Sequence, residues 1–166
     1  LFSTKDMCTL MHIPELVDAG IDSFKIEGRM KKKEYSAYLS SLYRHYVDVY
    51  ESEGKETFQA LVQNKESRLW KDIRRSKDIY NRGGFCAGYL FETDKKNIMY
   101  PKKNGHFGTC VGTVLKASKG QAVFRVKEAL HYQDILEFRL EDDTKAYEYT
   151  VKNEAAPGDL SLIHIS

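Results

Sequence analysis

The sequence lacks a strong charge of either sign and any long apolar run. Its 26 Lys and Arg residues nearly balance 24 Asp and Glu residues, which leaves a formal net charge of +2. So small a net charge does not by itself argue for nucleic-acid binding, although basic residues cluster locally. No run approaches the roughly 20 apolar residues that a membrane-spanning helix needs, and the mean hydropathy is −0.54. We therefore expect a folded protein without a membrane partner.

Cysteine is also scarce. Cys8, Cys86 and Cys110 are widely spaced, and no two of them have the C-x-x-C spacing of a zinc or redox site. Such cysteines are typical of small reduced residues in a cytoplasmic protein. Cys8 differs, because residues able to cap a helix, such as Ser3 and Asp6, precede it. This pattern predicts Cys8 in or beside a first helical turn, where the helix dipole stabilises a thiolate that can bind a metal or act as a nucleophile. Alternatively, Cys8 packs beneath the helix.

The motifs of several enzyme classes are absent. No Ser-His-Asp constellation, H-E-x-x-H motif or pair of aspartates can be assembled. Residues 81–91 are rich in glycine but lack the G-x-x-x-x-G-K-[ST] order of a phosphate-binding loop. We interpret these glycines as permitting a tight turn beside a bound group or a close strand crossing, with Arg82 free to point into a cleft. Among the scattered histidines, His106 is the best candidate to contact a substrate.

The first third of the chain predicts a helix, a strand, a polar loop and a second helix. Residues 13–20 predict a short helix, because Pro14 suits its first turn and Gly20 suits the position after its last turn. Residues 22–26 alternate with period two, which predicts a short strand. Residues 33–52 predict a long amphipathic helix. This order is one unit of a parallel α/β fold. The apolar stripe of the long helix consists of Tyr35, Tyr38, Leu39, Leu42, Tyr46 and Val49.

A charged loop follows the predicted strand. Glu27 and Arg29 lie on either side of Gly28, where a glycine permits close backbone approach. In α/β folds, the loops at the carboxyl ends of strands carry the chemistry. Glu27 is suited to orient a substrate or move a proton, and Arg29 to hold a carboxylate or phosphate with two hydrogen bonds. Alternatively, the two side chains form a structural ion pair.

Gly54 predicts the end of the long helix, and residues 55–80 predict a second helical stretch with a turn or kink at residues 64–67. One face of this stretch is basic. It is either a solvated helix face or a surface for phosphate groups. Its basic residues are Lys71, Arg74, Arg75 and Lys77.

The pattern changes after residues 93–104, a basic and turn-prone linker. Residues 105–160 show four period-two segments with short turns, which predict a small antiparallel β-barrel or sandwich. Such modules bind RNA in some proteins and merely cover another domain in others. Residues 161–166 resemble translated adapter sequence, so we expect a non-native tail there. We also expect the chain to be a fragment of a longer protein.

Several blocks together resemble the collagenase-like peptidase U-32 family. They are Ser-Thr-Lys-Asp-Met-Cys at residues 3–8, His-Ile-Pro-Glu-Leu-Val-Asp-Ala-Gly-Ile at 12–21, Phe-Lys-Ile-Glu-Gly-Arg-Met at 24–30, Asn-Arg-Gly-Gly-Phe at 81–85 and Gly-Tyr-Leu at 88–90. The resemblance covers nearly all of residues 1–156. It implies that residues 1–92 are the C-terminal part of a TIM-like (β/α) barrel, followed by a small antiparallel β-barrel module.

The resemblance also implies a chemistry. Several members of that family act in the hydroxylation of pyrimidines in transfer or ribosomal RNA, and others in oxygen-independent ubiquinone hydroxylation. These members resemble barrel proteins with an iron–sulfur cluster on four cysteines, and Cys8 stands at the position of the fourth. The other three lie upstream, in a segment absent from this sequence. Glu27 and Arg29 match the strand-end motif of the family.

We therefore predict a fragment of an iron–sulfur-dependent enzyme of RNA pyrimidine hydroxylation. The basic stretches at residues 30–33, 74–75 and 102–103 fit a polyanionic partner such as tRNA or rRNA. The alternatives are a collagenase-like peptidase acting on peptides and a non-catalytic family member. We expect neither activity nor a bound cluster from this chain alone, because a complete barrel needs roughly 250 residues. The predicted site residues are Glu27 and Arg29 for catalysis, Lys31, Arg82 and His106 for substrate binding, and Cys8 for the metal.

Overall fold

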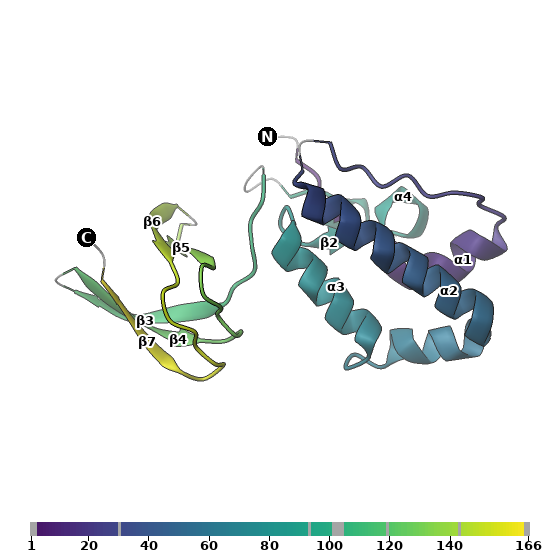
Figure 1. Cartoon of the computed structure of the whole chain (residues 1–166). Coiled ribbons are helices and arrows are strands. Elements are labelled where there is room, and N and C mark those ends of the chain that lie inside the picture. Colours follow the sequence, from purple (N-terminus) through teal and green to yellow (C-terminus); the bar gives the residue numbers. More distant parts are fainter. Residues whose placement is uncertain are drawn as a thin grey trace. The chain divides into compact units, whose positions relative to one another are not determined.

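The chain forms two compact units, Leu1–Thr109 and Cys110–Ser166, each of which is described here by itself (Figure 1). The structure is a computed structural model that describes residues 3–29, 31–92, 94–100, 105–118, 120–142 and 144–164. The first unit mixes helices with short strands, and the second consists of antiparallel strands. The mixed α and β class is therefore confirmed.

The first unit has eight elements in its described part. They are β1 (Asp6–Met7), the 3₁₀ helix η1 (Leu10–His12), α1 (Ile13–Asp18), α2 (Lys33–Gln63), α3 (Arg68–Ile79), β2 (Phe85–Cys86), α4 (Gly88–Phe91) and the 3₁₀ helix η2 (Lys95–Ile98). The predicted short helix is confirmed as α1, with Pro14 in its first turn. The break between α2 and α3 falls at residues 64–67, where the sequence predicted a turn or kink.

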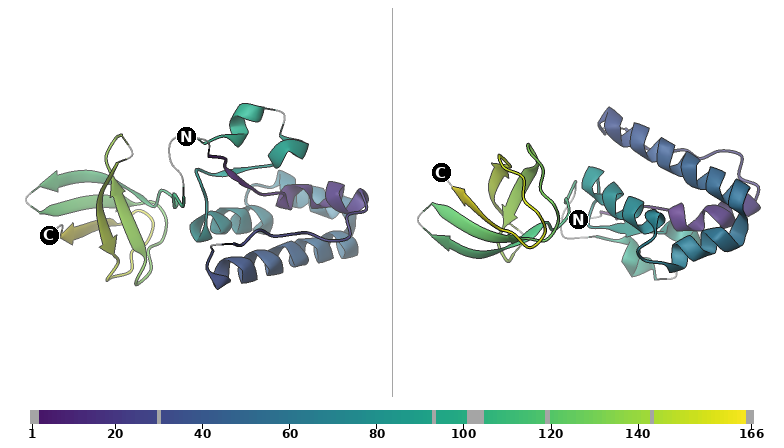
Figure 2. Two further views of the ribbon diagram at one scale, coloured as in Figure 1. Left: turned by 90° about the horizontal axis from the view of Figure 1, so that it is seen from above. Right: turned by 60° about the horizontal axis from the view of Figure 1, so that its bottom comes forward.

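The long helix α2 bends sharply at Gly54, whose φ of 82° and ψ of 178° are not helical. Glycine adopts a positive φ without steric cost, so the chain can change direction there and resume the helix. Figures 1 and 2 show the two arms of α2 on either side of this bend. Asp18 at the end of α1 fixes the bend, because it accepts a hydrogen bond from Tyr50 and pairs with Lys55 at 3.1 Å.

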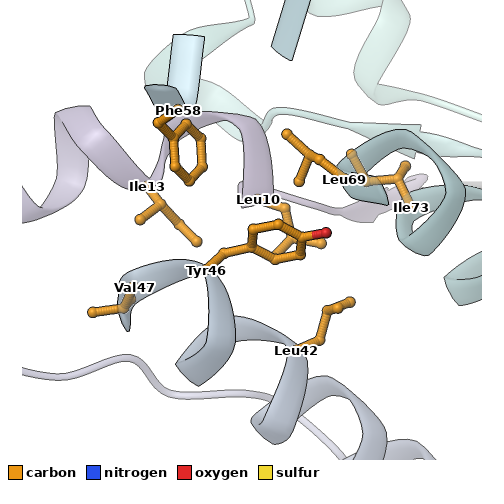
Figure 3. Close-up of a cluster of buried hydrophobic side chains, with 8 residues drawn as sticks. All are labelled: Leu10, Ile13, Leu42, Tyr46, Val47, Phe58, Leu69 and Ile73. Carbon is orange, nitrogen blue, oxygen red and sulfur yellow. The ribbon is translucent and has the colours of Figure 1, made fainter. Parts of the chain in front are cut away.

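The core of the first unit lies between η1, α1, α2 and α3 (Figure 3). The apolar stripe of α2 supplies Leu42 and Tyr46 to it, so the predicted buried face is correct. The Phe58 ring, on the second arm of α2, meets Tyr46 edge-on at 6.3 Å between centroids. The Tyr46 hydroxyl reaches Asp72 of α3 at 2.7 Å, which satisfies the polar end of a buried ring. The buried cluster consists of Leu10, Ile13, Leu42, Tyr46, Val47, Phe58, Leu69 and Ile73.

The N-terminal segment lies between two segments from late in the first unit. β1 pairs in parallel with β2, with Asp6 opposite Phe85 and Met7 opposite Cys86. On its other side, Thr4 forms an antiparallel bridge with Met99. These pairings bring residues about 80 to 95 positions apart in the sequence side by side.

The predicted strand at residues 22–26 is wrong. Residues 21–28 belong to neither a helix nor a strand. A strand requires a neighbouring strand for its backbone hydrogen bonds, and no described residue pairs with this segment in a ladder. The segment runs alongside α2 instead (Figure 2). There, Phe24 and Ile26 line a cavity of about 310 Å³ together with Tyr43 and Val47.

The second unit contains two antiparallel sheets. Its strands are β3 (Gly112–Ser118), β4 (Gln121–Val126), β5 (Ile135–Arg139), β6 (Lys145–Thr150) and β7 (Leu160–His164), paired in the orders β3-β4-β7 and β5-β6. The antiparallel strands are confirmed, but the described strands do not close into a barrel. A TIM-like barrel remains a prediction for the whole protein, because the described part of the first unit holds a parallel sheet of only two strands.

The predicted tail and the predicted linker both contain residues that belong to secondary structure. Residues 161–164, which the sequence sets apart as a tail, lie in β7, and Ile163 is 2% exposed in the core of the second unit. Part of the predicted linker, residues 93 and 101–104, is outside the described residues, while η2 within it packs beside the N-terminal segment. None of the described helices combines the length and the apolar character needed to cross a bilayer.

Replacing Phe58 with Ala should lower the free energy of unfolding of the chain by about 3–5 kcal/mol, because the fully buried ring leaves a cavity. Tyr89, on α4, is 76% exposed and provides the control. Tyr89→Ala should change the free energy by less than about 0.5 kcal/mol. Urea titrations followed by circular dichroism measure both values. Equal losses in the two variants would contradict the assignment of the core.

Candidate functional site

Cys8 lies directly after β1 and lines a cavity of about 30 Å³. Its backbone N–H donates to the Cys86 carbonyl at 2.9 Å, which continues the pairing of β1 with β2. Tyr35, Tyr43 and Tyr80 contribute to the walls of the same cavity. The predicted metal ligand therefore lies at the carboxyl end of a parallel strand, in a cavity that three tyrosines and Phe85 line.

The prediction that a helix start lowers the pKa of Cys8 is wrong. Thr9, not a residue before Cys8, is the N-cap of η1, so Cys8 lies beside the first turn rather than in it. Burial raises the pKa of the Cys8 thiol, and hydrogen bonds from the Leu10 amide and the Tyr43 hydroxyl only partly oppose this effect. Without a bound cation, the thiol of Cys8 therefore favours its protonated form.

Arg82 is held against β1 by Asp6. The Arg82 Nε and Nη2 atoms lie 3.0 and 2.8 Å from Asp6 Oδ1, and the Arg82 backbone N–H donates to Asp6 Oδ2 at 2.8 Å. The Asp6 side chain is only 16% exposed, and a buried carboxylate requires such a partner. The interpretation of Arg82 as free to point into a cleft is therefore wrong, because two of its three guanidinium nitrogens contact Asp6.

Tyr80, which follows α3 directly, contacts two of the three predicted substrate-binding residues, Lys31 and His106. The Lys31 ammonium lies 2.9 Å from the centroid of the Tyr80 ring. The His106 imidazole stacks on Tyr80 with 5.2 Å between centroids and 19° between planes. Tyr35 approaches the Tyr80 ring edge-on at 6.2 Å. A cation, a stacked imidazole and the Cys8 cavity thus meet at one tyrosine.

Asn81 holds this arrangement together. Its backbone N–H donates to His106 Nδ1 at 3.1 Å, and its side-chain amide donates to the carbonyls of Lys77 and Gly108 at 2.8 and 2.9 Å. The Asn81 Oδ1 atom accepts from the Gly84 N–H at 3.0 Å. Asn81 is 3% exposed. Asn81 and Tyr80 were not among the predicted site residues, and their only signal in the sequence is their position between a helical pattern and two glycines.

Glu27 and Arg29 are exposed, and neither lines the Cys8 cavity. Glu27 Oε1 accepts from the Arg29 backbone N–H at 3.0 Å, and Glu27 Oε2 lies 3.9 Å from Lys25 Nζ. The alternative ion pair between the two side chains is not among the contacts of the described residues. A Cβ on Gly28 would lie 2.4 Å from Ser36 Oγ, so the turn passes close to the start of α2. The Lys31 backbone N–H donates to the Gly28 carbonyl at 3.0 Å. This hydrogen bond places Glu27 and Arg29, on either side of Gly28, close to Lys31 in the same turn.

The basic face of α3 mostly serves local contacts. Arg74 Nη1 donates to the Lys65 carbonyl at 3.2 Å. Arg75 lies 5.8 Å from the Tyr38 ring centroid, and Lys77 lies 5.7 Å from that of Phe85. These contacts favour a structural face over a dedicated phosphate site. Of the other predicted basic stretches, residues 31–33 are described, whereas residue 30 and residues 102–103 are outside the described residues.

The described residues fit one ligand of an iron–sulfur cluster but not a whole site. Such clusters need four thiolates or their equivalents. No group of three His, Cys, Asp or Glu side chains in the described ranges is arranged to hold a metal. The Cys8 thiol reaches a cavity and can serve as one ligand. The remaining ligands would have to come from residues outside those described.

The model of peptidase family U32 matches residues 1–100. Because this match covers more than half of the 166 residues, the chain belongs to that family. The segment with Cys8, the Glu27–Arg29 turn and the Tyr80 arrangement all fall within the matched range, apart from His106.

The chain is similar to proteins of two descriptions. It is 33% identical over 97 residues to an uncharacterized protease of Methanocaldococcus jannaschii. It is 48% identical over 48 residues to a tRNA hydroxylation protein of Bacillus subtilis. It is 27% identical over 174 residues to a 23S rRNA 5-hydroxycytidine synthase of Escherichia coli.

The aligned segments take in 58%, 29% and 98% of the chain, respectively. They span only 21%, 11% and 26% of those relatives. No solved protein structure matches the chain significantly.

Raising the pH should destabilise the chain through Tyr43. Burial raises the pKa of Tyr43 to about 12, while the Cys8 thiol beside it acts in the same direction. Between about pH 10 and pH 12, the unfolded tyrosine loses its proton and the folded one keeps it. The stabilisation is therefore fully present below about pH 10 and is lost as the pH rises to about 12, with a change of about 2 kcal/mol.

Tyr43→Phe should remove this part of the alkaline loss, whereas the exposed Tyr89→Phe should not. Urea unfolding at about pH 9 and about pH 12 measures the difference for each variant. The same alkaline loss in Tyr43→Phe and in the unsubstituted chain would show that Tyr43 does not titrate as its burial requires.

Proposed function

We propose that the whole protein hydroxylates a pyrimidine in transfer or ribosomal RNA. In this proposal the chain supplies part of the RNA-binding surface and one cysteine ligand of an iron–sulfur cluster. The observation that carries it is the convergence of Lys31 and His106 on Tyr80, next to the cavity that Cys8 lines. Relatives named as tRNA and rRNA hydroxylation proteins support the substrate class.

The described side chains have distinct proposed roles. The Lys31 ammonium would contact a phosphate, because it lies over the Tyr80 ring and no described carboxylate pairs with it. Arg82 would act through its remaining nitrogen, Nη1, while Asp6 fixes the direction of the guanidinium. Glu27 would accept a proton from the substrate and Arg29 would hold a phosphate, since both lie exposed in the turn that leads to Lys31.

Cys8 would be one thiolate ligand of the cluster. A bound cluster would supply electron transfer, and its positive iron would lower the pKa that burial raises in the free thiol. The cavity walls of Tyr35, Tyr43 and Tyr80 would restrict water at this ligand. We place the reaction in the cytoplasm, where its RNA substrates are made.

Peptide hydrolysis is the second candidate, and the name of the family and that of the Methanocaldococcus relative favour it. The sequence, however, contains no recognisable combination of nucleophile and base. RNA hydroxylation ranks first, because it also accounts for the relatives named as tRNA and rRNA hydroxylation proteins.

The full-length protein, expressed in cells that lack its gene, tests this proposal. Mass spectrometry of digested tRNA and rRNA should detect a pyrimidine with one added oxygen in cells with the unsubstituted protein. Cys8→Ala should abolish the product and lower the iron content of the anaerobically purified protein. The matched variant Cys110→Ala, at an exposed cysteine of the second unit, should leave both unchanged. An iron-free protein that cleaves gelatin, or full hydroxylation by Cys8→Ala, would refute the proposal.

A further inference from the structure

We infer that the exposed ring of His106 is a stacking platform for an unpaired base of single-stranded RNA. This inference rests on the proposed function, because it specifies how the same surface would hold its RNA. It adds the contact to the base, which neither the family nor the names of the relatives assign.

One face of the His106 ring packs on Tyr80, and the residue as a whole is exposed. The imidazole lies nearly parallel to Tyr80, at 19° and 5.2 Å between centroids. His106 is nevertheless exposed, and among the described residues its ring stacks only on Tyr80. A base placed on the open face would extend the stack of two rings to three. Unpaired bases commonly stack in this way on histidine and tyrosine side chains.

The ring is fixed before any ligand arrives. The Asn81 N–H donates to His106 Nδ1 at 3.1 Å, and Asn81 is itself buried and tied to the Gly108 carbonyl at 2.9 Å. A fixed ring loses little rotational freedom on binding, which favours affinity. Because Nδ1 accepts a hydrogen bond, Nε2 carries the proton of the neutral imidazole. His106 Nε2 is thus a donor available to a base carbonyl or a phosphate oxygen.

The surroundings favour RNA over a peptide or a metal ion. Lys31 brings a positive charge to Tyr80, and stacking rings combined with cations are typical of single-stranded nucleic-acid sites. The described residues place no group of three metal ligands here.

The test compares two labelled RNA oligomers with the same number of phosphates, one of cytidines and one abasic. Fluorescence anisotropy with the 166-residue chain should show about tenfold tighter binding of the cytidine oligomer, the value expected for one stacked base. His106→Ala should remove this preference and leave the weaker, salt-dependent binding of both oligomers. His106→Phe keeps a flat ring and should retain most of the preference. His131→Ala, at an exposed histidine of the second unit, is the matched control and should behave like the unsubstituted chain.

The outcomes separate this inference from the proposed function. Equal binding of the two oligomers by the unsubstituted chain would overturn the platform but leave RNA as the partner. If His106→Phe lost the preference for the cytidine oligomer as completely as His106→Ala, the platform would also be overturned. Stacking on a flat ring would then not be the cause of the preference. No binding of either oligomer would overturn both the platform and RNA recognition by this surface. If His106→Ala fails to fold, the platform is still tested by comparing the binding of the cytidine and abasic oligomers to the unsubstituted chain and to His106→Phe.

Discussion

The pair of Asp6 and Arg82 is the interaction on which the candidate site depends. The Asp6 side chain is only 16% exposed, and a carboxylate removed from water in this way is costly without a hydrogen-bonded partner. Arg82 provides that partner with both its guanidinium and its backbone N–H. Since Asp6 belongs to β1 and Arg82 to the loop after α3, the pair fixes the loop beside the strand that leads to Cys8. Tyr80 and Asn81, the two residues before Arg82, are positioned by the same contact.

The helical core and the site are linked through α3. Leu69 and Ile73 pack this helix on α2 and η1, and its last residues lead directly to Tyr80. Asn81 then connects the end of α3 to His106, because its side chain donates to the Lys77 carbonyl and its backbone N–H donates to His106 Nδ1. Because α2 begins just after Lys31, both long helices present their ends at Tyr80. The chemistry that we propose therefore depends on helix ends, which the core holds in place.

The sequence predicted what its periodicity could reveal and missed what depends on contacts between distant segments. The stripe of α2, the interruption at Gly54 and the strands β3 to β6 follow from local patterns, because each pattern matches the face that is buried. The strand at residues 22–26 failed, since a period of two predicts a strand only where a partner is present. The burial of Cys8 and the engagement of Arg82 arise from segments almost 80 residues apart, which no local pattern encodes. The family resemblance identified the family correctly, whereas the roles of Glu27 and Arg29 remain predictions.

The proposed RNA-binding surface requires that Lys31, Tyr80 and His106 meet in the folded chain. Nuclear Overhauser spectroscopy of the 166-residue protein in solution tests this most directly. We expect cross-peaks between the Tyr80 ring and the His106 ring, and between the Tyr80 ring and the terminal methylene of Lys31. Cross-peaks between Tyr46 and Phe58 would show in the same sample that the core is formed. A sample with the core cross-peaks but without those of Tyr80 would contradict the account.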